Sequence, residues 1–341
     1  MNYRALFEEG REALRTAGIG EADLDARLLL EHVCETDRNT LLVHGDREVS
    51  VLEEVCYRQL IWKRVAREPL QYLTGTQEFM GLEFLVDERV LIPRQDTEIL
   101  VEEALRNLHD GMRVLDLCTG SGCILISLLA YSNNCSGVGV DLSREALELA
   151  RENAVKLLGA EVLTSDGQDE SAVRSAPGEQ EESAETQVSG EWVEFAEAQV
   201  SGEQARFAET PLSYSQSVSG CGRSVTFLQS DLFEKAEGKF DMIVSNPPYI
   251  RTKVLETLMP EVREHEPLLA LDGGEDGLRF YRRILEGCPG SLKKGGMLFL
   301  EIGYDQGEDV ADLMEKAGFL EVQIIKDYGG HDRVVCGTLS F

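Results

Sequence analysis

An Asn-Pro-Pro-Tyr tetrapeptide at residues 246–249 carries the clearest sign of chemistry in this sequence, because it ends an apolar run typical of a buried strand. The side-chain carbonyl of Asn246 and the backbone carbonyl of Pro247, which has no N–H, can accept both hydrogens of an –NH2 group. Pro248 follows, and Tyr249 adds an aromatic face. The pattern suggests methyl transfer to a planar nitrogen, whose delocalised lone pair must be oriented before it attacks an electrophile. Taken alone, it equally fits a strand followed by a proline turn.

A second segment, 113–124, reads as a buried strand, a loop with Gly120 and Gly122, and the start of a helix. Ligands bind at such strand ends, and glycines let them approach the backbone closely. A dinucleotide fingerprint would require glycine where Leu125 stands, and the Gly-Lys-Ser/Thr of a phosphate-binding loop is missing. The next strand ends in Asp141, at a position where acids commonly bind ribose hydroxyls. We therefore predict S-adenosylmethionine as the ligand, with any nucleotide-binding α/β domain as the alternative.

These motifs belong to an α/β pattern in which strands alternate with helices from about residue 90 onward. The pattern predicts a seven-stranded, mostly parallel sheet. Because the loop 328–332 is too short for a parallel crossover, the strand after it should run antiparallel to its neighbour. The predicted strands are 113–118, 136–142, 225–231, 240–246, 296–302, 321–327 and 333–339.

The first 75 residues have helical spacing and predict a small helical bundle, with one helix over 51–65. An alternating stretch after it predicts a hairpin linker at 76–89, which leads into the second domain, 90–341. A basic cluster near the end of the predicted helix indicates a solvated face, with partner binding as the alternative. This cluster comprises Arg58, Lys63, Arg64 and Arg67.

One segment, 161–224, interrupts the α/β rhythm with a polar, acidic sequence. A Glu-x-Gln-Val-Ser-Gly-Glu pattern at 185–191 recurs at 197–203, a period of 12 residues. Residues 161–225 contain 13 acids and three arginines. We predict an insertion that is disordered, because such a composition buries little apolar area. A folded accessory hairpin that packs around Trp192 is the alternative.

The composition narrows the class of protein. The chain has 341 residues, 43% of them hydrophobic and 28% charged, and a net charge of −29. That charge disfavours a protein that lies along a phosphate backbone. No apolar run approaches the ~18 residues of a membrane span, and the first residues lack a signal-peptide pattern. The eight cysteines form no Cys-x-x-Cys pair, so we expect reduced thiols in a cytosolic protein and no bound metal. We also expect the protein to be a monomer.

Outside the insertion, the chain resembles the HemK/PrmC family, the methyltransferases that modify the Gly-Gly-Gln glutamine of peptide chain release factors. The resemblance covers nearly the whole chain. Each supporting motif is weak by itself, but the order and spacing of the set are specific. The motifs lie at residues 67–75, 90–98, 116–122, 246–249, 265–267 and 301–303.

The resemblance implies a Rossmann-like class I fold that methylates the glutamine side-chain nitrogen (N5) and acts in translation termination. It implies that residues 1–75 recognise the substrate and that residues 246–249 hold the glutamine. The residues implied to bind S-adenosylmethionine are Cys118, Thr119, Gly120, Ser121, Gly122, Asp141, Asp231, Leu232 and Asn246, with Asp231 and Leu232 beside the adenine.

The sequence departs from the family at two positions. Many members have proline where Gln95 stands, which affects a local turn, and many have a larger aromatic residue where Leu232 stands, which weakens the assignment of adenine stacking. His265 is a candidate base, although methyl transfer to an amide requires none, and Glu301 is a candidate for shaping the pocket.

Other functions stay open at this point. A DNA adenine or cytosine amino-methyltransferase would use the same tetrapeptide on a flipped base. The 14 acids and 10 basic residues of the first 75 argue against a DNA clamp there. A non-catalytic S-adenosylmethionine-binding module would leave the tetrapeptide unexplained. Ribosomal or other protein amides are further substrates to consider.

Overall fold

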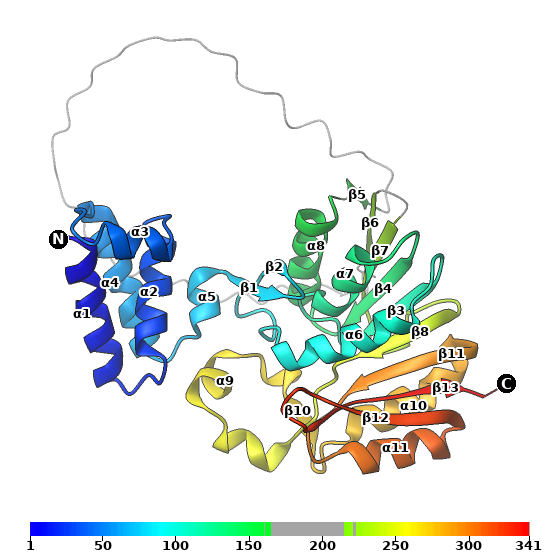
Figure 1. Cartoon of the computed structure of the whole chain (residues 1–341). Coiled ribbons are helices and arrows are strands. Elements are labelled where there is room, and N and C mark those ends of the chain that lie inside the picture. Colours follow the sequence, from blue (N-terminus) through cyan, green and yellow to red (C-terminus); the bar gives the residue numbers. More distant parts are fainter. Residues whose placement is uncertain (160, 165–214, 221–222, 341) are drawn as a thin grey trace, which may run out of the picture.

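The computed structural model describes residues 1–159, 161–164, 215–220 and 223–340 (Figure 1). A bundle of helices at the N-terminus adjoins a larger α/β domain (Figure 1). The bundle helices are α1 (Tyr3–Thr16), α2 (Ala22–Val33), α3 (Arg38–Val43), α4 (Val51–Val65) and α5 (Leu70–Thr74).

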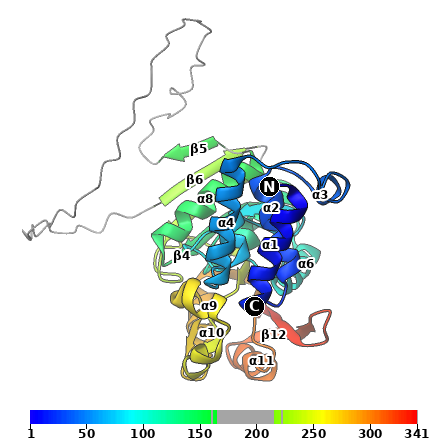
Figure 2. The ribbon, with the colours of Figure 1, turned by 90° about the vertical axis from the view of Figure 1, so that its left-hand side faces the viewer.

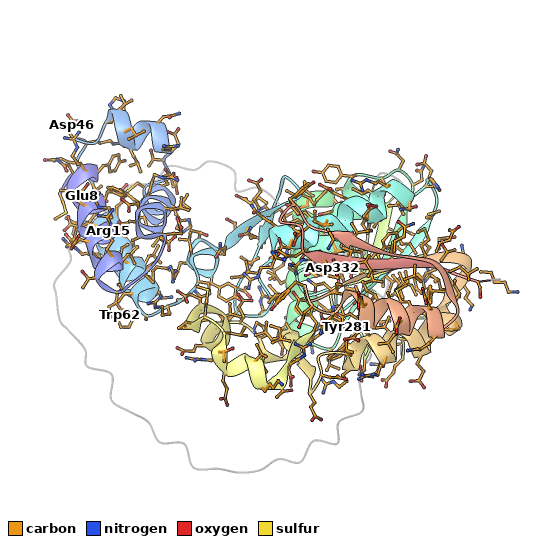
Figure 3. The ribbon with its side chains drawn as sticks, turned by 60° about the horizontal axis from the view of Figure 1, so that its bottom comes forward. Glu8, Arg15, Asp46, Trp62, Tyr281 and Asp332 are labelled. Carbon is orange, nitrogen blue, oxygen red and sulfur yellow. The ribbon has the colours of Figure 1, made fainter. Side chains whose placement is uncertain are left out.

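Helix α4 has the bounds that the sequence predicts. Its start is fixed by a capping box, in which the Ser50 hydroxyl accepts from the Glu53 N–H at 3.2 Å and the Glu53 carboxylate accepts from the Ser50 N–H at 2.6 Å. Its inner face buries Tyr57 and Ile61 against α1 and α2. Trp62 lies at the periphery of the bundle, whereas Tyr281 lies inside the α/β domain (Figure 3).

The basic cluster near the end of α4 divides into two parts. Arg58 forms exposed ion pairs with acids on the bundle itself. Arg64, in contrast, is 8% exposed, and its guanidinium contacts Asp25 at 2.8 Å and Glu261 at 3.2 Å. Arg67 donates to the same Glu261 oxygen at 3.2 Å. The solvated-face interpretation is therefore wrong for Arg64, because its buried side chain pairs with Asp25 of the bundle and with Glu261 of helix α9 (Pro260–His265). Figure 2 shows α9 below α4.

The hairpin that follows the bundle packs into the α/β domain. Strands β1 (Thr76–Phe79) and β2 (Leu82–Leu85) pair antiparallel, and Phe79 and Phe84 join a core cluster of that domain. The Asn153 side-chain carbonyl accepts from the Leu85 N–H at 2.7 Å. The hairpin therefore belongs structurally to the α/β domain.

The seven predicted strands all form, and they share one sheet. They are β3 (Arg113–Leu117), β4 (Ser136–Asp141), β7 (Arg223–Gln229), β8 (Phe240–Ser245), β11 (Leu292–Glu301), β12 (Phe319–Lys326) and β13 (Asp332–Leu339). The order along the sheet is β12-β13-β11-β8-β3-β4-β7-β6-β5, so two further strands extend one edge. As predicted, β13 runs antiparallel to both neighbours, and the others from β11 to β7 run parallel.

Helices cover both faces of the sheet. One core cluster contains α6 (Glu98–Asn107), α7 (Cys123–Ala130) and α8 (Arg144–Leu158), and the other contains α10 (Arg279–Ser291) and α11 (Gly307–Lys316). Successive strand residues alternate between the clusters: Val114 packs in the first and Leu115 in the second. Because both faces are covered, the central strands β3, β4 and β8 are buried along most of their length.

The connection after β8 contains short elements that lie beside the strand ends. They are β9 (Ile250–Arg251), the 3-10 turn Thr252–Thr257, α9, the 3-10 turn Leu268–Ala270 and β10 (Asp272–Gly274). Another 3-10 turn, Gln95–Thr97, precedes α6, so the turn forms with glutamine at its first position.

The ends of the predicted insertion form the two additional strands. Strands β5 (Glu161–Thr164) and β6 (Ser215–Gly220) pair antiparallel, and β6 pairs with β7. Sequence analysis did not predict them, since their backbones pair at the edge of a sheet that forms through distant segments. Residues 165–214, which contain the repeat and Trp192, lie outside the described residues, so the prediction of disorder is not tested there.

Among the described residues, the structure contains no helix long and apolar enough to cross a membrane. Over that same part of the chain, no three His, Cys, Asp or Glu side chains gather where they could hold a metal ion.

The β5–β6 register predicts that residues 165–215 can be replaced by a tight two-residue turn. Thr164 pairs with Gln216, so the two strand ends lie opposite each other and an Asn-Gly turn can join them. We expect the shortened protein to keep a thermal midpoint no lower than the parent's, since closing a shorter loop costs less entropy.

Calorimetry of the two proteins tests this expectation. The control variant joins Gly159 directly to Arg223, which also removes β5 and β6 and uncovers the edge of β7; we expect it to melt lower. A lower midpoint for the Asn-Gly variant would contradict the prediction.

Candidate active site

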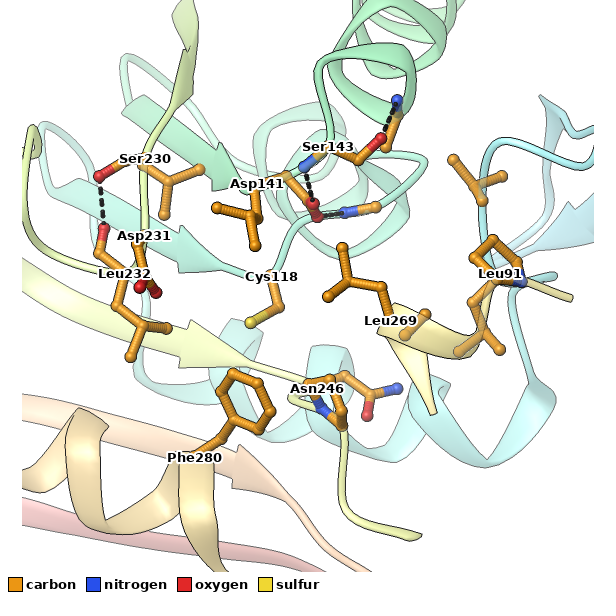
Figure 4. Close-up of a pocket in the computed structure, with 18 of the residues that line it drawn as sticks. Leu91, Cys118, Asp141, Ser143, Ser230, Asp231, Leu232, Asn246, Leu269 and Phe280 are labelled. Carbon is orange, nitrogen blue, oxygen red and sulfur yellow. Dashed lines mark hydrogen bonds between the residues drawn. The ribbon is translucent and has the colours of Figure 1, made fainter. Parts of the chain in front are cut away.

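A pocket that is partly open to solvent lies at the carboxyl ends of β3, β4, β7 and β8 (Figure 4). Most of its lining is apolar, and polar side chains are few. The lining includes Arg89, Cys118, Gly120, Asp141, Leu232, Asn246, Pro248 and Phe280.

The loop after β3 presents its backbone to the pocket. Cys118 has a φ of 59° and Gly120 a φ of 54°, and both line the pocket. A Cβ added to Gly120 would meet no atom within 4 Å, so the space above this residue is open. The left-handed conformation of Cys118, a non-glycine residue, is costly and is typical of functional loops.

The other predicted loop residues hold this conformation from behind. The Thr119 hydroxyl donates to Asp116 at 2.5 Å, and the Ser121 carbonyl accepts from Asn153 at 3.0 Å. Gly122 allows α7 to pack, because a Cβ there would lie 2.8 Å from Ile126. Thr119, Ser121 and Gly122 do not line the pocket, so their cofactor roles stay predictions.

Asp141 connects this loop to the next one. Its carboxylate accepts from the Gly120 N–H and the Ser143 N–H, each at 2.9 Å (Figure 4). Burial raises the pKa of Asp141, and these two backbone hydrogen bonds oppose that effect. Each carboxylate oxygen keeps capacity for another hydrogen bond. Asp141 can therefore bind a hydroxyl-bearing ligand while it holds the loop.

The end of β7 closes the pocket on a second side. The Ser230 N–H donates to the Asp141 carbonyl at 2.9 Å, and the Ser230 hydroxyl donates to the Leu232 carbonyl at 2.9 Å. Asp231 also lines the pocket, although its carboxylate pairs with Arg283 at 2.9 Å. Leu232 is buried, with a φ of 52°. Both residues of the predicted pair thus line the pocket, and Asp231 already has a cationic partner.

Asn246 and Pro248 form the third side, beyond the end of β8. The Asn246 amide donates from Nδ2 to the Thr97 hydroxyl at 3.3 Å. Tyr249 does not line the pocket; its ring packs on a core cluster and its hydroxyl donates to Glu301 at 3.5 Å. The structure therefore places Asn246 at the pocket, whereas the tyrosine side chain contacts Glu301 and the core.

The two candidate acid–base groups have different environments. His265 ends α9 and does not line the pocket. Glu301 is buried at the end of β11, and burial raises its pKa to about 7. Its Oε2 atom has no hydrogen-bond partner among the described residues. Glu301 contacts Tyr249 behind the pocket, and its role in shaping the pocket stays a prediction.

Sequence patterns alone missed Phe280, which begins the inner face of α10. Figure 4 shows its ring between Leu232 and Asn246, so an aromatic ring lines the pocket although position 232 is leucine. Its signal was the apolar spacing of α10, which is typical of core packing rather than of a site.

Comparison with known proteins agrees with this architecture. A family model described as the PrmC N-terminal domain matches residues 5–75, and one described as a methyltransferase domain matches residues 108–165. A release factor glutamine methyltransferase of Geobacter sulfurreducens is 36% identical over 338 residues, 99% of this chain and 96% of that protein.

The chain belongs to the release factor glutamine methyltransferase family. Relatives of the same name from Caulobacter vibrioides and Moorella thermoacetica are also 36% identical. The first alignment covers 96% of this chain and 93% of the relative, and the second covers 98% and 97%. Family membership confirms the resemblance that the sequence motifs indicate.

The buried carboxyl of Asp116 should make the stability of this protein depend on pH. The carboxyl is fully buried, and burial raises its pKa to about 7, although the hydrogen bond from Thr119 acts in the opposite direction. The unfolded carboxyl has a pKa of ~3.9, so between these values the folded state binds a proton that the unfolded state does not. Stability from this group is complete below pH ~4 and is lost as the pH rises to about 7.

We expect Asp116→Asn, which cannot ionise, to gain stability relative to the parent between pH 4 and 7. The gain is on the order of 3 kcal/mol at pH 8, and urea unfolding at each pH measures it. Asp110→Asn, at an exposed position, controls for the loss of one negative charge. A difference between Asp116→Asn and parent that stays constant from pH 4 to 8 would contradict the neutral buried carboxyl.

Proposed function

We propose that this chain transfers a methyl group from S-adenosylmethionine to the side-chain amide nitrogen (N5) of the glutamine in the Gly-Gly-Gln motif of peptide chain release factors. The observation that supports this proposal most directly is the position of Asn246. It lines the pocket, and its amide nitrogen donates a hydrogen bond to the Thr97 hydroxyl at 3.3 Å. Its carbonyl is then left to accept from a substrate –NH2 group.

The pocket fits S-adenosylmethionine by its chemistry. The open space at Gly120 admits a ligand close to the backbone, Asp141 can accept from ribose hydroxyls, and the side chains of Leu232 and Phe280 offer apolar surface. A phosphate would need cationic partners, but Arg89, which lines the pocket, pairs with Asp87 at 2.7 Å. The lining therefore suits an adenosine-containing ligand without phosphates.

When bound, S-adenosylmethionine supplies an electrophilic methyl group. Asn246 and the Pro247 carbonyl orient the glutamine amide, so that its nitrogen points toward that methyl group. As positive charge grows on nitrogen, both acceptors stabilise it. No strong base is needed, because the alkylated amide is acidic enough to lose its proton to water. This agrees with the position of His265, which does not line the pocket.

The helical bundle is proposed to contact the release factor. Arg64 and Arg67 join it to Glu261 on α9, and Pro267 and Leu269, a few residues farther along the chain, line the pocket. The bundle is thus held near the pocket by buried ion pairs. We also propose a cytoplasmic monomer that acts on protein and not on nucleic acid or membranes.

One assay separates the candidate substrates. Labelled S-adenosylmethionine is incubated with a purified release factor, with its Gln→Ala variant in the Gly-Gly-Gln motif, and with duplex DNA. We expect label only in the unchanged release factor. Label in DNA would favour an amino-methyltransferase of nucleic acid, and absence of label with detectable cofactor binding would favour a binding module.

Asn246→Ala should abolish transfer and leave the fold intact. Losing one group that stabilises developing charge typically costs ~10²-fold or more in turnover. We expect S-adenosylmethionine affinity to stay within about tenfold, since Asn246 is one of many lining residues. Asn107→Ala, on α6 and remote from the pocket lining, is the control. Near-normal turnover by Asn246→Ala would disprove the mechanism.

Asp141→Ala should weaken S-adenosylmethionine binding by roughly 1.5–3 kcal/mol, the usual range for hydrogen bonds to a charged group. Isothermal titration calorimetry measures the change. The control is Glu145→Ala, which removes an acid four residues along that does not line the pocket. Equal affinities of Asp141→Ala and parent would place the cofactor elsewhere.

A further inference from the structure

We propose that Thr97 and Glu301 act as positioning residues that turn the carbonyl of the Asn246 amide, and not its –NH2 group, toward the substrate. The inference rests on the proposed function, and it assigns a role in that reaction to two buried residues that do not line the pocket. Three elements meet at this point: the turn before α6, the end of β8 and the end of β11.

The sheet register brings Glu301 beside Asn246. Strands β8 and β11 run parallel, with Leu300 opposite Ser245, so the next residue of each strand follows at the same edge. Thr97 reaches the same place from the turn Gln95–Thr97. Its side chain is 2% exposed, and its hydroxyl lies 3.3 Å from Asn246 Nδ2.

The direction of these contacts decides the chemistry. An asparagine amide can present either its carbonyl or its –NH2 group, and only the carbonyl can accept from a substrate amide. If the Thr97 hydroxyl accepts from Asn246 Nδ2, the carbonyl is left for the substrate. If the hydroxyl instead donates to Asn246, the amide turns over and presents the wrong group.

Glu301 determines to which partner the Thr97 hydroxyl donates its hydrogen bond. Its carboxyl follows Leu300 at the same sheet edge as Asn246, which bonds Thr97, and the Thr97 hydroxyl lowers the carboxyl pKa. An ionised carboxylate can only accept, so the Thr97 hydroxyl donates its hydrogen bond to Glu301 and its oxygen accepts from Asn246. Glu301 Oε2 is buried and accepts no hydrogen bond from the described residues, so it can accept this one.

The ionisation of Glu301 gives this arrangement a pH dependence. Burial raises the carboxyl pKa to about 7, and the groups facing it are Arg333 on β13, Asp96 beside Thr97, and Tyr249. Tyr281 and Cys123, on α10 and α7, sense the same carboxyl. Arg333 favours the ionised form and Asp96 the neutral form. We expect turnover to rise with pH through this range as the carboxylate forms.

The test compares Thr97→Val, which keeps the shape and loses the hydroxyl, with Thr97→Ser, which keeps the hydroxyl. We expect Thr97→Val to lower kcat by about 10- to 100-fold, the cost of a misplaced group, while Thr97→Ser stays within about threefold of the parent. The dissociation constant of S-adenosylmethionine should stay within about twofold in both, which also verifies folding. Thr338→Val, on β13 opposite Met297 and so at the end of the β11–β13 pairing away from Glu301, is the control.

Glu301→Gln provides an independent reading, because glutamine keeps an acceptor oxygen and cannot ionise. We expect the rise of kcat between pH 6 and 8 to be lost in Glu301→Gln and kept in Thr338→Val. Parent-like kcat in Thr97→Val, or equal losses in Thr97→Val and Thr97→Ser, would overturn the inference even when the parent methylates the release factor. A parent that leaves the release factor unmodified would contradict the proposed function, and with it the inference.

Discussion

The site depends on the parallel register of three neighbouring strands. Leu117 at the end of β3 and Leu300 near the end of β11 both lie opposite Ser245 of β8. The next residues along these strands therefore emerge at one edge: the Cys118 loop, Asn246 and Glu301. A shift of one residue in any pair would turn each side chain to the other face of the sheet. The two core clusters oppose such a shift, since each strand residue is buried on a specific face.

The same geometry explains why polar groups at this edge are linked to one another. Asp141 holds two loop N–H groups, and the Ser245 hydroxyl donates to the Leu117 carbonyl at 2.7 Å. Loops at strand ends lack the repeating hydrogen bonds of the sheet, so side chains must supply them. These bonds keep the residues that line the pocket in place before any ligand binds, which lowers the entropic cost of binding.

Sequence patterns predict what depends on local spacing. The seven strands, the antiparallel last strand and the asparagine at the pocket follow from apolar runs, loop lengths and one tetrapeptide. Three features depend on contacts between distant segments and were not predictable: the Thr97–Asn246 hydrogen bond, the Phe280 ring and the Arg64–Glu261 ion pair. Each of these residues has a local pattern typical of a turn, a core helix or a solvated helix face. The placement of the tyrosine ring behind the pocket likewise depends on Glu301, which lies 52 residues away.

Two buried acids near the site show how stability and function compete here. Asp116 and Glu301 are each about 1% exposed or less, and each has a carboxyl oxygen without a hydrogen-bond partner among the described residues. A stable core would place apolar residues at such positions, because an unpaired buried polar atom costs about 1–3 kcal/mol. Asp116 offsets part of this cost by holding Thr119, which fixes the loop at Cys118 and Gly120. Glu301 has no such backbone role through its carboxyl; its contacts lead to Tyr249 and Thr97, and through Thr97 to Asn246. The free-energy cost of burying this acid is therefore best explained by the orientation of the one amide that must meet the substrate.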